Sequence, residues 1–143
     1  MSTPGMYENN KIRFEAQAAA TGGALDMSTA DIRAAIIDDT DYTANFVTDI
    51  DRAEAGIATA SVSNLAAGLG TKTFTNGDFN AADDTFTSVS GDGVDSTLVY
   101  EHDAIAANAE LIVLLDNGGA TTPNGNDINV VWAAGPNFIF ILD

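Results

Sequence analysis

Leu111-Ile112-Val113-Leu114-Leu115 is the stretch that decides the fold, because these apolar residues are consecutive. Successive side chains of a β-strand point to opposite faces of the sheet, so a strand made of this run is hydrophobic on both faces. The sequence therefore predicts a strand over 109–116 that is either central in a sheet or covered by another subunit. A second run of the same kind is Phe138-Ile139-Phe140-Ile141-Leu142.

Around this stretch, short β-branched and aromatic runs are separated by Gly, Asn and Asp. The sequence predicts strands over 57–65, 71–75, 84–90, 96–102, 109–116, 127–133 and 137–143. Residues 31–39 alternate in polarity, which favours another strand, although Ser28-Thr29-Ala30-Asp31 could instead cap a short helix. The predicted fold class is mainly β: an antiparallel β-sandwich or small barrel of about seven to eight strands with a short N-terminal helix.

Two local patterns refine this prediction. Asn76-Gly77 indicates a tight turn, because both residues tolerate a positive φ. In 127–133, Ile128, Val130 and Trp132 share one face of the strand, so that face is expected to point into the core. A short helical turn is predicted within 44–55.

The start of the chain has a different composition. Residues 1–10 are predicted to be an arm, because Pro4-Gly5 disfavours regular structure. Good helix formers and an apolar face at three- and four-residue spacing predict a short helix over about 8–20. A chain of 143 residues suits one domain, so we expect 11–143 to form a single mainly-β domain together with this helix.

The charge is strongly negative, with five Lys and Arg against 21 Asp and Glu and a net charge of −16. Such a surface repels nucleic acid and anionic membranes, so neither is expected as a partner. No apolar run is long enough to span a bilayer, and the first residues do not resemble a signal peptide. The absence of cysteine excludes disulfides, thiolate metal sites and cysteine nucleophiles.

The residues that could support catalysis are few. His102 is the only histidine, and no Gly-x-Ser-x-Gly motif accompanies it. We interpret it as a residue at a strand end. The carboxylates are concentrated in predicted turns, where water keeps their pKa values ordinary, so the sequence predicts a protein that is not an enzyme.

A calcium site is the one metal site that needs consideration. Gly91-Asp92-Gly93-Val94-Asp95 is similar to a single glycine-aspartate calcium repeat, which makes Asp92 and Asp95 weak candidate ligands. Such sites require stacked copies of the repeat, and this one occurs once. The simpler expectation is that these Asp side chains close their own turns and that no cofactor is bound.

Several blocks of turn and core residues carry a resemblance to a known family. The blocks are Ala35-Ile36-Ile37-Asp38-Asp39-Thr40-Asp41-Tyr42-Thr43, Phe79-Asn80-Ala81-Ala82-Asp83-Asp84-Thr85-Phe86, Val89-Ser90-Gly91-Asp92, Leu98-Val99-Tyr100, Leu111-Ile112 with Leu115-Asp116, and Thr122-Pro123-Asn124-Gly125-Asn126-Asp127-Ile128 with Trp132 and Asn137-Phe138-Ile139-Phe140. From about residue 31 to the end, the chain resembles small virion proteins of tailed phages. The family commonly has a lysine where this chain has Phe138, so the C-terminal strand is more apolar here.

The resemblance implies a structural component of the virion, and our preferred role is a capsid decoration (cement) protein on the capsid surface. Its expected partner is the major capsid protein, bound across capsomer joints by a homotrimer. The candidate interface residues are Pro4, Met6, Tyr7, Leu111, Val113, Leu115, Phe138 and Phe140. A tail, neck or head-fibre component is the first alternative, and a carbohydrate-binding adhesion module is the second.

Overall fold

In a computed structural model of the chain, the described residues are 5–7, 26, 27, 29–38, 40, 42–52, 62–65, 68–75, 78–91, 93–132, 140 and 141. Within this part, the chain forms ten strands and one short 3₁₀ turn, η1 (Ala106–Asn108). All strand pairs are antiparallel, and the sheets do not close into a barrel. The predicted mainly-β class is confirmed, whereas the helix predicted over 8–20 lies outside the described residues.

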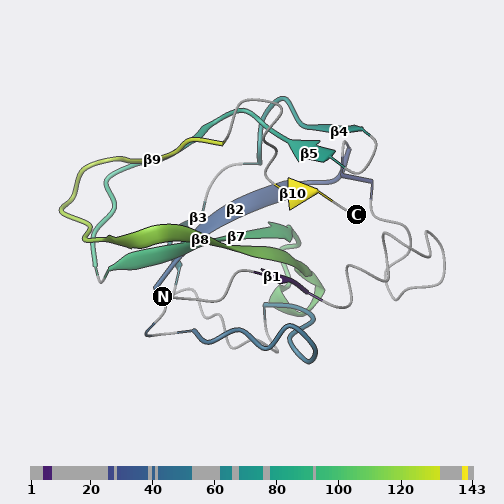
Figure 1. Ribbon diagram of the computed structural model, residues 1–143, viewed down its shortest axis with the longest axis horizontal. Helices are drawn as coiled ribbons and strands as arrows, with labels where there is room; N and C mark the ends of the chain where they lie inside the picture. Colours follow the sequence, from purple (N-terminus) through teal and green to yellow (C-terminus); the bar gives the residue numbers. More distant parts are fainter. Residues whose placement is uncertain are drawn as a thin grey trace.

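The largest sheet has five strands in the order β1-β8-β7-β2-β3 (Figure 1). Its strands are β1 (Gly5–Met6), β2 (Ile32–Ile37), β3 (Val62–Leu65), β7 (Val94–Glu101) and β8 (Leu111–Thr121). β7 and β8 are the two longest strands of the described chain, and they run side by side through the middle of the molecule. The strand predicted around the apolar run is therefore central, with β1 on one side and β7 on the other.

Two smaller sheets complete the architecture. One has the order β10-β5-β4, and the other pairs β6 with β9. Their strands are β4 (Thr73–Thr75), β5 (Asp78–Asn80), β6 (Asp84–Phe86), β9 (Ile128–Val130) and β10 (Phe140–Ile141). Figure 1 shows β4, β5 and β9 on one side of the large sheet and the segment 42–52 on the other.

Both faces of the large sheet are buried under the chain's own residues. The first core cluster packs the sheet against the smaller sheets and contains Met27, Ile32, Ala34, Ile36, Leu69, Phe79, Phe86, Val89, Val94, Val99, Ile112, Val113 and Trp132. The second core cluster lies on the opposite face and contains Tyr7, Ala35, Ile37, Tyr42, Leu98, Tyr100, Ala109, Leu111 and Leu114. The two-sided hydrophobicity of β2, β7 and β8 is thus explained by burial within one chain.

A bulge adjusts which face of β8 each side chain reaches. Val99 is opposite Val113 and Tyr100 is opposite Leu111, so Ile112 is an extra residue in the ladder. A bulge of this kind shifts the alternation by one residue. As a result, Ile112 and Val113 both belong to the first core cluster, while Leu111 and Leu114 belong to the second.

The structure confirms most of the predicted strands and changes some of their limits. Residues 31–39 contain β2 and not a capped helix, and Trp132 is buried as predicted. The strand predicted over 84–90 ends at Phe86, because Ser88 has a positive φ of 53° in a turn. The strand predicted over 109–116 continues to Thr121.

Three further segments show where local patterns succeeded or failed. The prediction of a helical turn within 44–55 is confirmed, since the Asp49 N–H donates to the Asn45 carbonyl at 2.9 Å. The register of β4 and β5 leaves only the predicted turn residues Asn76 and Gly77 between them, although β5 itself was not predicted. The prediction that Pro4-Gly5 prevents regular structure is wrong for Gly5–Met6, which pairs with β8.

Candidate functional site

The N-terminal segment is held by a small set of specific contacts, which we call the N-terminal clasp. The clasp consists of Tyr42, Phe46 and Asp49 from the segment 42–52 together with Ile112, Val113 and Leu114 of β8, and it holds Gly5, Met6 and Tyr7. The Tyr7 N–H donates to the Ile112 carbonyl at 3.0 Å, and the Tyr7 ring lies against the Phe46 ring at 5.0 Å between centroids. Tyr7 is completely buried as a result.

A hydrogen-bonded chain of two hydroxyls and one carboxylate closes the clasp. The Tyr7 and Tyr42 hydroxyl oxygens are 2.7 Å apart, and the Tyr42 hydroxyl donates to Asp49 Oδ2 at 2.9 Å. Because a phenol has a single proton to donate, Tyr42 uses it on Asp49 and accepts the proton of Tyr7. The direction of this chain therefore requires both tyrosines to carry their phenolic protons.

Burial keeps the tyrosines neutral. Desolvation raises the pKa values of both Tyr7 and Tyr42 above the usual range for tyrosine, because the interior disfavours the phenolate. The nearby Asp49 carboxylate acts in the same direction on both groups. The clasp is consequently a structural hydrogen-bond network across the whole neutral pH range.

The predicted interface residues are mostly interior residues of this chain. Tyr7, Leu111 and Val113 are buried, while Met6 and Leu115 are half-buried against the first core cluster. Within one chain these five residues form no exposed contact face, because β8 is central and β1 is docked on it. The backbone of Phe140 belongs to β10, and Pro4 and Phe138 lie outside the described residues.

A different group of apolar side chains is exposed. Val47, Ile50 and Ile105 are 73%, 37% and 62% exposed. They lie on two segments that hydrogen-bond to each other, since the Arg52 N–H donates to the Ala109 carbonyl at 3.1 Å and the Leu111 N–H to the Ile50 carbonyl at 3.0 Å. We call these three residues the loop-end patch. Sequence reasoning missed it, because isolated apolar residues in turn-forming segments form no periodic pattern.

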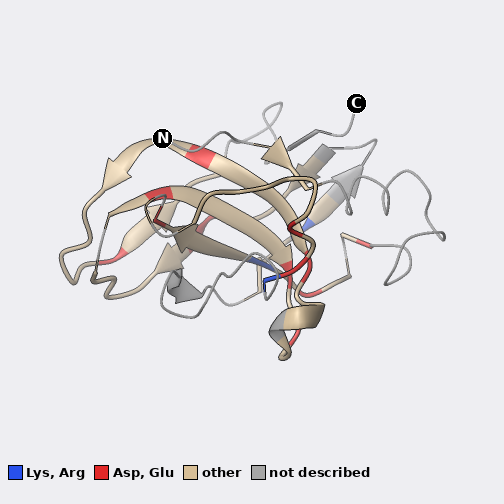
Figure 2. Ribbon diagram, turned by 90° about the horizontal axis from the view of Figure 1, so that it is seen from below, with Lys and Arg blue, Asp and Glu red and all other residues tan. Residues whose placement is uncertain are grey.

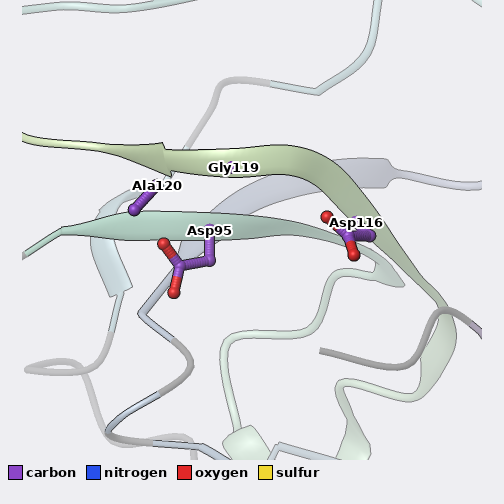
Figure 3. A pocket seen from close by; sticks show the side chains of 4 residues that line it. All are labelled: Asp95, Asp116, Gly119 and Ala120. Carbon is purple, nitrogen blue, oxygen red and sulfur yellow. The ribbon is translucent and has the colours of Figure 1, made fainter. Parts of the chain in front are cut away.

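The second half of β8 forms a hollow beside the candidate calcium ligand Asp95 (Figure 3). Val94 is opposite Thr121 and Ser96 is opposite Asp116, so several residues of β8 bulge out against Asp95 alone. The hollow has a volume of about 200 Å³ and is lined by Asp95, Asp116, Gly119 and Ala120. Gly118 and Gly119 adopt positive φ values of 77° and 150°, which glycine reaches without a steric penalty.

The carboxylates at this hollow differ in their partners. Asp116 Oδ1 accepts the Gly118 N–H at 2.7 Å and closes its own turn. Asp95 Oδ1 is buried without a hydrogen-bond partner. The other candidate ligand, Asp92, lies outside the described residues. Within the part of the chain that is described, no three His, Asp or Glu side chains are grouped closely enough to hold a metal ion.

His102 follows β7 directly, at the strand end where the sequence placed it. Its backbone N–H donates to the Asp31 carbonyl at 2.8 Å, and its ring lies edge-on to Tyr100 at 6.2 Å. The neighbouring Asp103 does not orient the imidazole, because its Oδ1 accepts the Ile105 N–H at 2.7 Å. The geometry around His102 therefore offers backbone contacts and ring packing.

Many of the acidic side chains bond to the backbone. Asp38, Asp103 and Asp116 each accept the N–H of the residue two positions later, at 2.7–2.8 Å. Asp127 accepts the Ser88 N–H and Asp83 accepts the Trp132 N–H, both at 2.9 Å, and these bonds link distant segments. Asp38, Asp103 and Asp116 therefore close their own turns, whereas Asp83 and Asp127 do not. The same expectation for Asp92 lies outside the described residues, and the buried Asp95 Oδ1 makes no such bond.

The charges on the described surface are predominantly negative, and Figure 2 shows acidic residues on several strands and loops with few basic ones. Arg33 pairs with Asp31 at 2.8 Å, and this hydrogen bond lowers the pKa of Asp31 below its usual range. None of the helices in the described ranges is long and apolar enough to cross a membrane.

Comparisons with protein-family models and with curated proteins gave no match to this chain. The molecule is thus characterised by its architecture and contacts: an antiparallel, mainly-β protein with acidic turns and a clasped N-terminal segment.

Proposed function

We propose that this chain is a non-enzymatic structural subunit of a tailed-phage virion, and that it acts as a capsid decoration protein. The observation that carries the proposal is the use of the acidic side chains: Asp38, Asp83, Asp103, Asp116 and Asp127 all accept backbone N–H groups. Carboxylates used in this way stabilise turns and links between segments, and apart from the buried Asp38 they contribute negative charge near the surface. The resemblance of residues 31–143 to small virion proteins supports the same function.

The proposed contact surface is the loop-end patch. A protein interface needs an apolar centre with few charges, and Val47, Ile50 and Ile105 supply exposed apolar area on adjoining segments. The charged residues in the rest of the described chain are mostly acidic, which disfavours contact with DNA there. We propose that this patch contacts the major capsid protein, and that a homotrimer places several patches on neighbouring shell subunits.

The physical role would be to oppose expansion of the filled capsid. Apolar burial contributes roughly 25 cal/mol per Å² before the costs of association are subtracted. A single contact of this kind is weak, but a shell contains many equivalent joints, and contacts across each joint resist their separation. The acidic surface suits the outside of the shell, away from the packaged DNA.

Imaging of intact particles tests the proposal most directly. We expect density for this fold on the outer capsid surface, in a copy number proportional to the number of shell subunits. Location at the tail, neck or a fibre, with few copies, would contradict the decoration role. Absence from purified particles would contradict the virion assignment itself.

Substitution in the loop-end patch tests the contact surface. Ile105→Asp should reduce the amount of protein bound to isolated capsids, because a charge would be buried in the contact. Val131→Asp is the matched control, since Val131 is 72% exposed but belongs to a different segment. Equal binding by the two variants would rule out the patch while leaving the location in the particle open.

A further inference from the structure

The N-terminal clasp recognises three consecutive residues, and each is recognised in a different way. A Cβ on Gly5 would lie 2.9 Å from Phe46 Cζ, so glycine is the residue that fits this position without a shift of the Phe46 ring. Met6 packs against the first core cluster, and Tyr7 fills a buried position in the second. The Tyr7 hydroxyl adds a 2.7 Å hydrogen bond to Tyr42. The clasp therefore has the properties of a peptide-binding site that is specific for Gly-Met-Tyr.

The site also lies on an edge of β8 where strand pairing is possible over a short stretch only. On the outer side of β8, β1 pairs with only Val113 and Leu114. Further along, Gly118 and Gly119 have positive φ values within the bulge, and such irregularity prevents regular strand pairing. Among the described residues, no other strand pairs with this edge of β8. The edge thus accepts an added strand at the clasp, where the terminal segment binds.

The segment occupies the edge of the large sheet. β1 is an edge strand of two residues, so the pairings within β8-β7-β2-β3 do not run through it. Residues 8–25 connect the segment to the rest of the described chain, and 18 residues have a maximum length of roughly 60 Å. A connection with this number of residues does not by itself tie the segment to the clasp of its own chain.

We propose that the N-terminal segment is exchanged between copies of this chain, so that the clasp of one copy holds Gly5, Met6 and Tyr7 of another. The occupant is an identical segment, and every contact of the clasp is therefore preserved in the exchanged form. In the closed form, the segment occupies the clasp of its own chain; in the exchanged form, it occupies the clasp of another copy. Because the clasp contacts are the same in both forms, only the connection over 8–25 and the local concentration of copies decide which form is more stable. Close packing of copies in an assembly favours exchange. The proposal does not depend on the virion function.

Disulfide trapping tests the exchange, and the absence of cysteine from the natural sequence makes each introduced pair unique. Met6 and Val113 are directly opposite each other in the antiparallel ladder, at a spacing that a disulfide can bridge. Full-length M6C and V113C chains with tags of different size are mixed at high concentration, unfolded, refolded together and oxidised. The control mixture pairs M6C with V131C, whose cysteine is exposed and follows β9, which does not pair with β8. Products are separated on a non-reducing gel.

We expect the M6C and V113C mixture to give about tenfold more cross-linked heterodimer than the M6C and V131C mixture, because exchange holds the pair in place. The M6C/V113C double variant gives the closed form directly as a disulfide within one chain. If the double variant closes only within one chain and the mixture gives no excess heterodimer, the proposal is overturned. If the double variant forms no disulfide of either kind, β1 does not dock on β8, and the proposal is also overturned.

Discussion

The two halves of β8 belong to one strand but have opposite surroundings. In the first half, Leu111, Ile112, Val113 and Leu114 are buried, with cores on both faces and β1 along the outer edge. In the second half, residues 117–121 are exposed, and 117–120 bulge out between the Ser96–Asp116 and Val94–Thr121 pairs. One end of β8 thus lies in the centre of the fold, and the other end is exposed to solvent. We call the exposed end, residues 117–121, the rim.

The difference shows that strand length and strand burial are separate properties. Hydrophobic residues on both faces required two covering layers, and the chain supplies them from the smaller sheets and from the segment 42–52. The second half of β8 has no such apolar residues to cover. There, Asp116 closes a turn, and Gly118 and Gly119 make the backbone irregular. An irregular rim also protects the molecule from pairing with other strands along most of this edge.

The largest effect is expected from truncating a side chain in the buried half. Leu114→Ala should reduce the free energy of unfolding by about 3 kcal/mol, because it removes buried contacts and leaves a cavity. Thr121→Ala in the exposed half should change it by less than about 0.5 kcal/mol. Urea denaturation of both variants measures the contrast, and similar losses would show that the halves are not energetically distinct.

The second largest effect on stability is expected from substitution in the clasp, and two buried tyrosines provide a matched pair of variants. Tyr42→Phe should destabilise the fold by about 2 kcal/mol, because the buried Tyr7 hydroxyl loses its acceptor. Tyr100→Phe should be neutral or stabilising, since the buried Tyr100 hydroxyl has no hydrogen-bond partner. Thermal unfolding distinguishes them, and equal losses would contradict the importance of the hydrogen-bonded chain.

The same tyrosines predict alkaline unfolding. Burial raises the pKa values of Tyr7, Tyr42 and Tyr100 in the folded chain, so the unfolded chain loses its phenolic protons first as the pH rises. Their contribution to stability is complete below about pH 10 and decreases above it by roughly 1.4 kcal/mol per tyrosine per pH unit. Tyrosine absorbance and circular dichroism should therefore change together. Ionisation of all three tyrosines before unfolding would contradict this expectation.

A smaller effect is expected at the rim. Gly118→Ala should cost about 1 kcal/mol, because a Cβ disfavours the φ of 77° at this position. Gly118→Asn should cost less, since asparagine tolerates this conformation. Differential scanning calorimetry of the two variants checks the ranking, and an equal cost would show that the bulge relaxes to another conformation.

The smallest effect is expected at Asp95. Asp95→Asn should change the free energy of unfolding by less than about 0.5 kcal/mol, because one carboxylate oxygen already lacks a partner. We expect calcium to leave the melting temperature of both forms unchanged, with magnesium as the ion control. A calcium-dependent increase that Asp95→Asn abolishes would instead establish a calcium site, since ligand binding stabilises the folded state.

The sequence by itself indicated the mainly-β class, a strand that is hydrophobic on both faces at 111–115, a strand within 31–39 and the acidic turns. These features are local, because alternation, consecutive apolar residues and Asp-rich turns act over a few neighbouring residues. The burial of Trp132 followed from its strand pattern in the same way.

Only the tertiary structure decided what covers the hydrophobic strands and where the N-terminal segment lies. Leu111 and Val113 are as hydrophobic in an interior as in an interface, so the sequence could not tell the chain's own core from a neighbouring subunit. Gly5–Met6 forms a strand because β8 offers backbone partners and Phe46 leaves room for a glycine, and both conditions come from residues distant in sequence. Contacts between distant residues form only when the chain is folded, which is why the clasp and the loop-end patch had no signature in the local pattern.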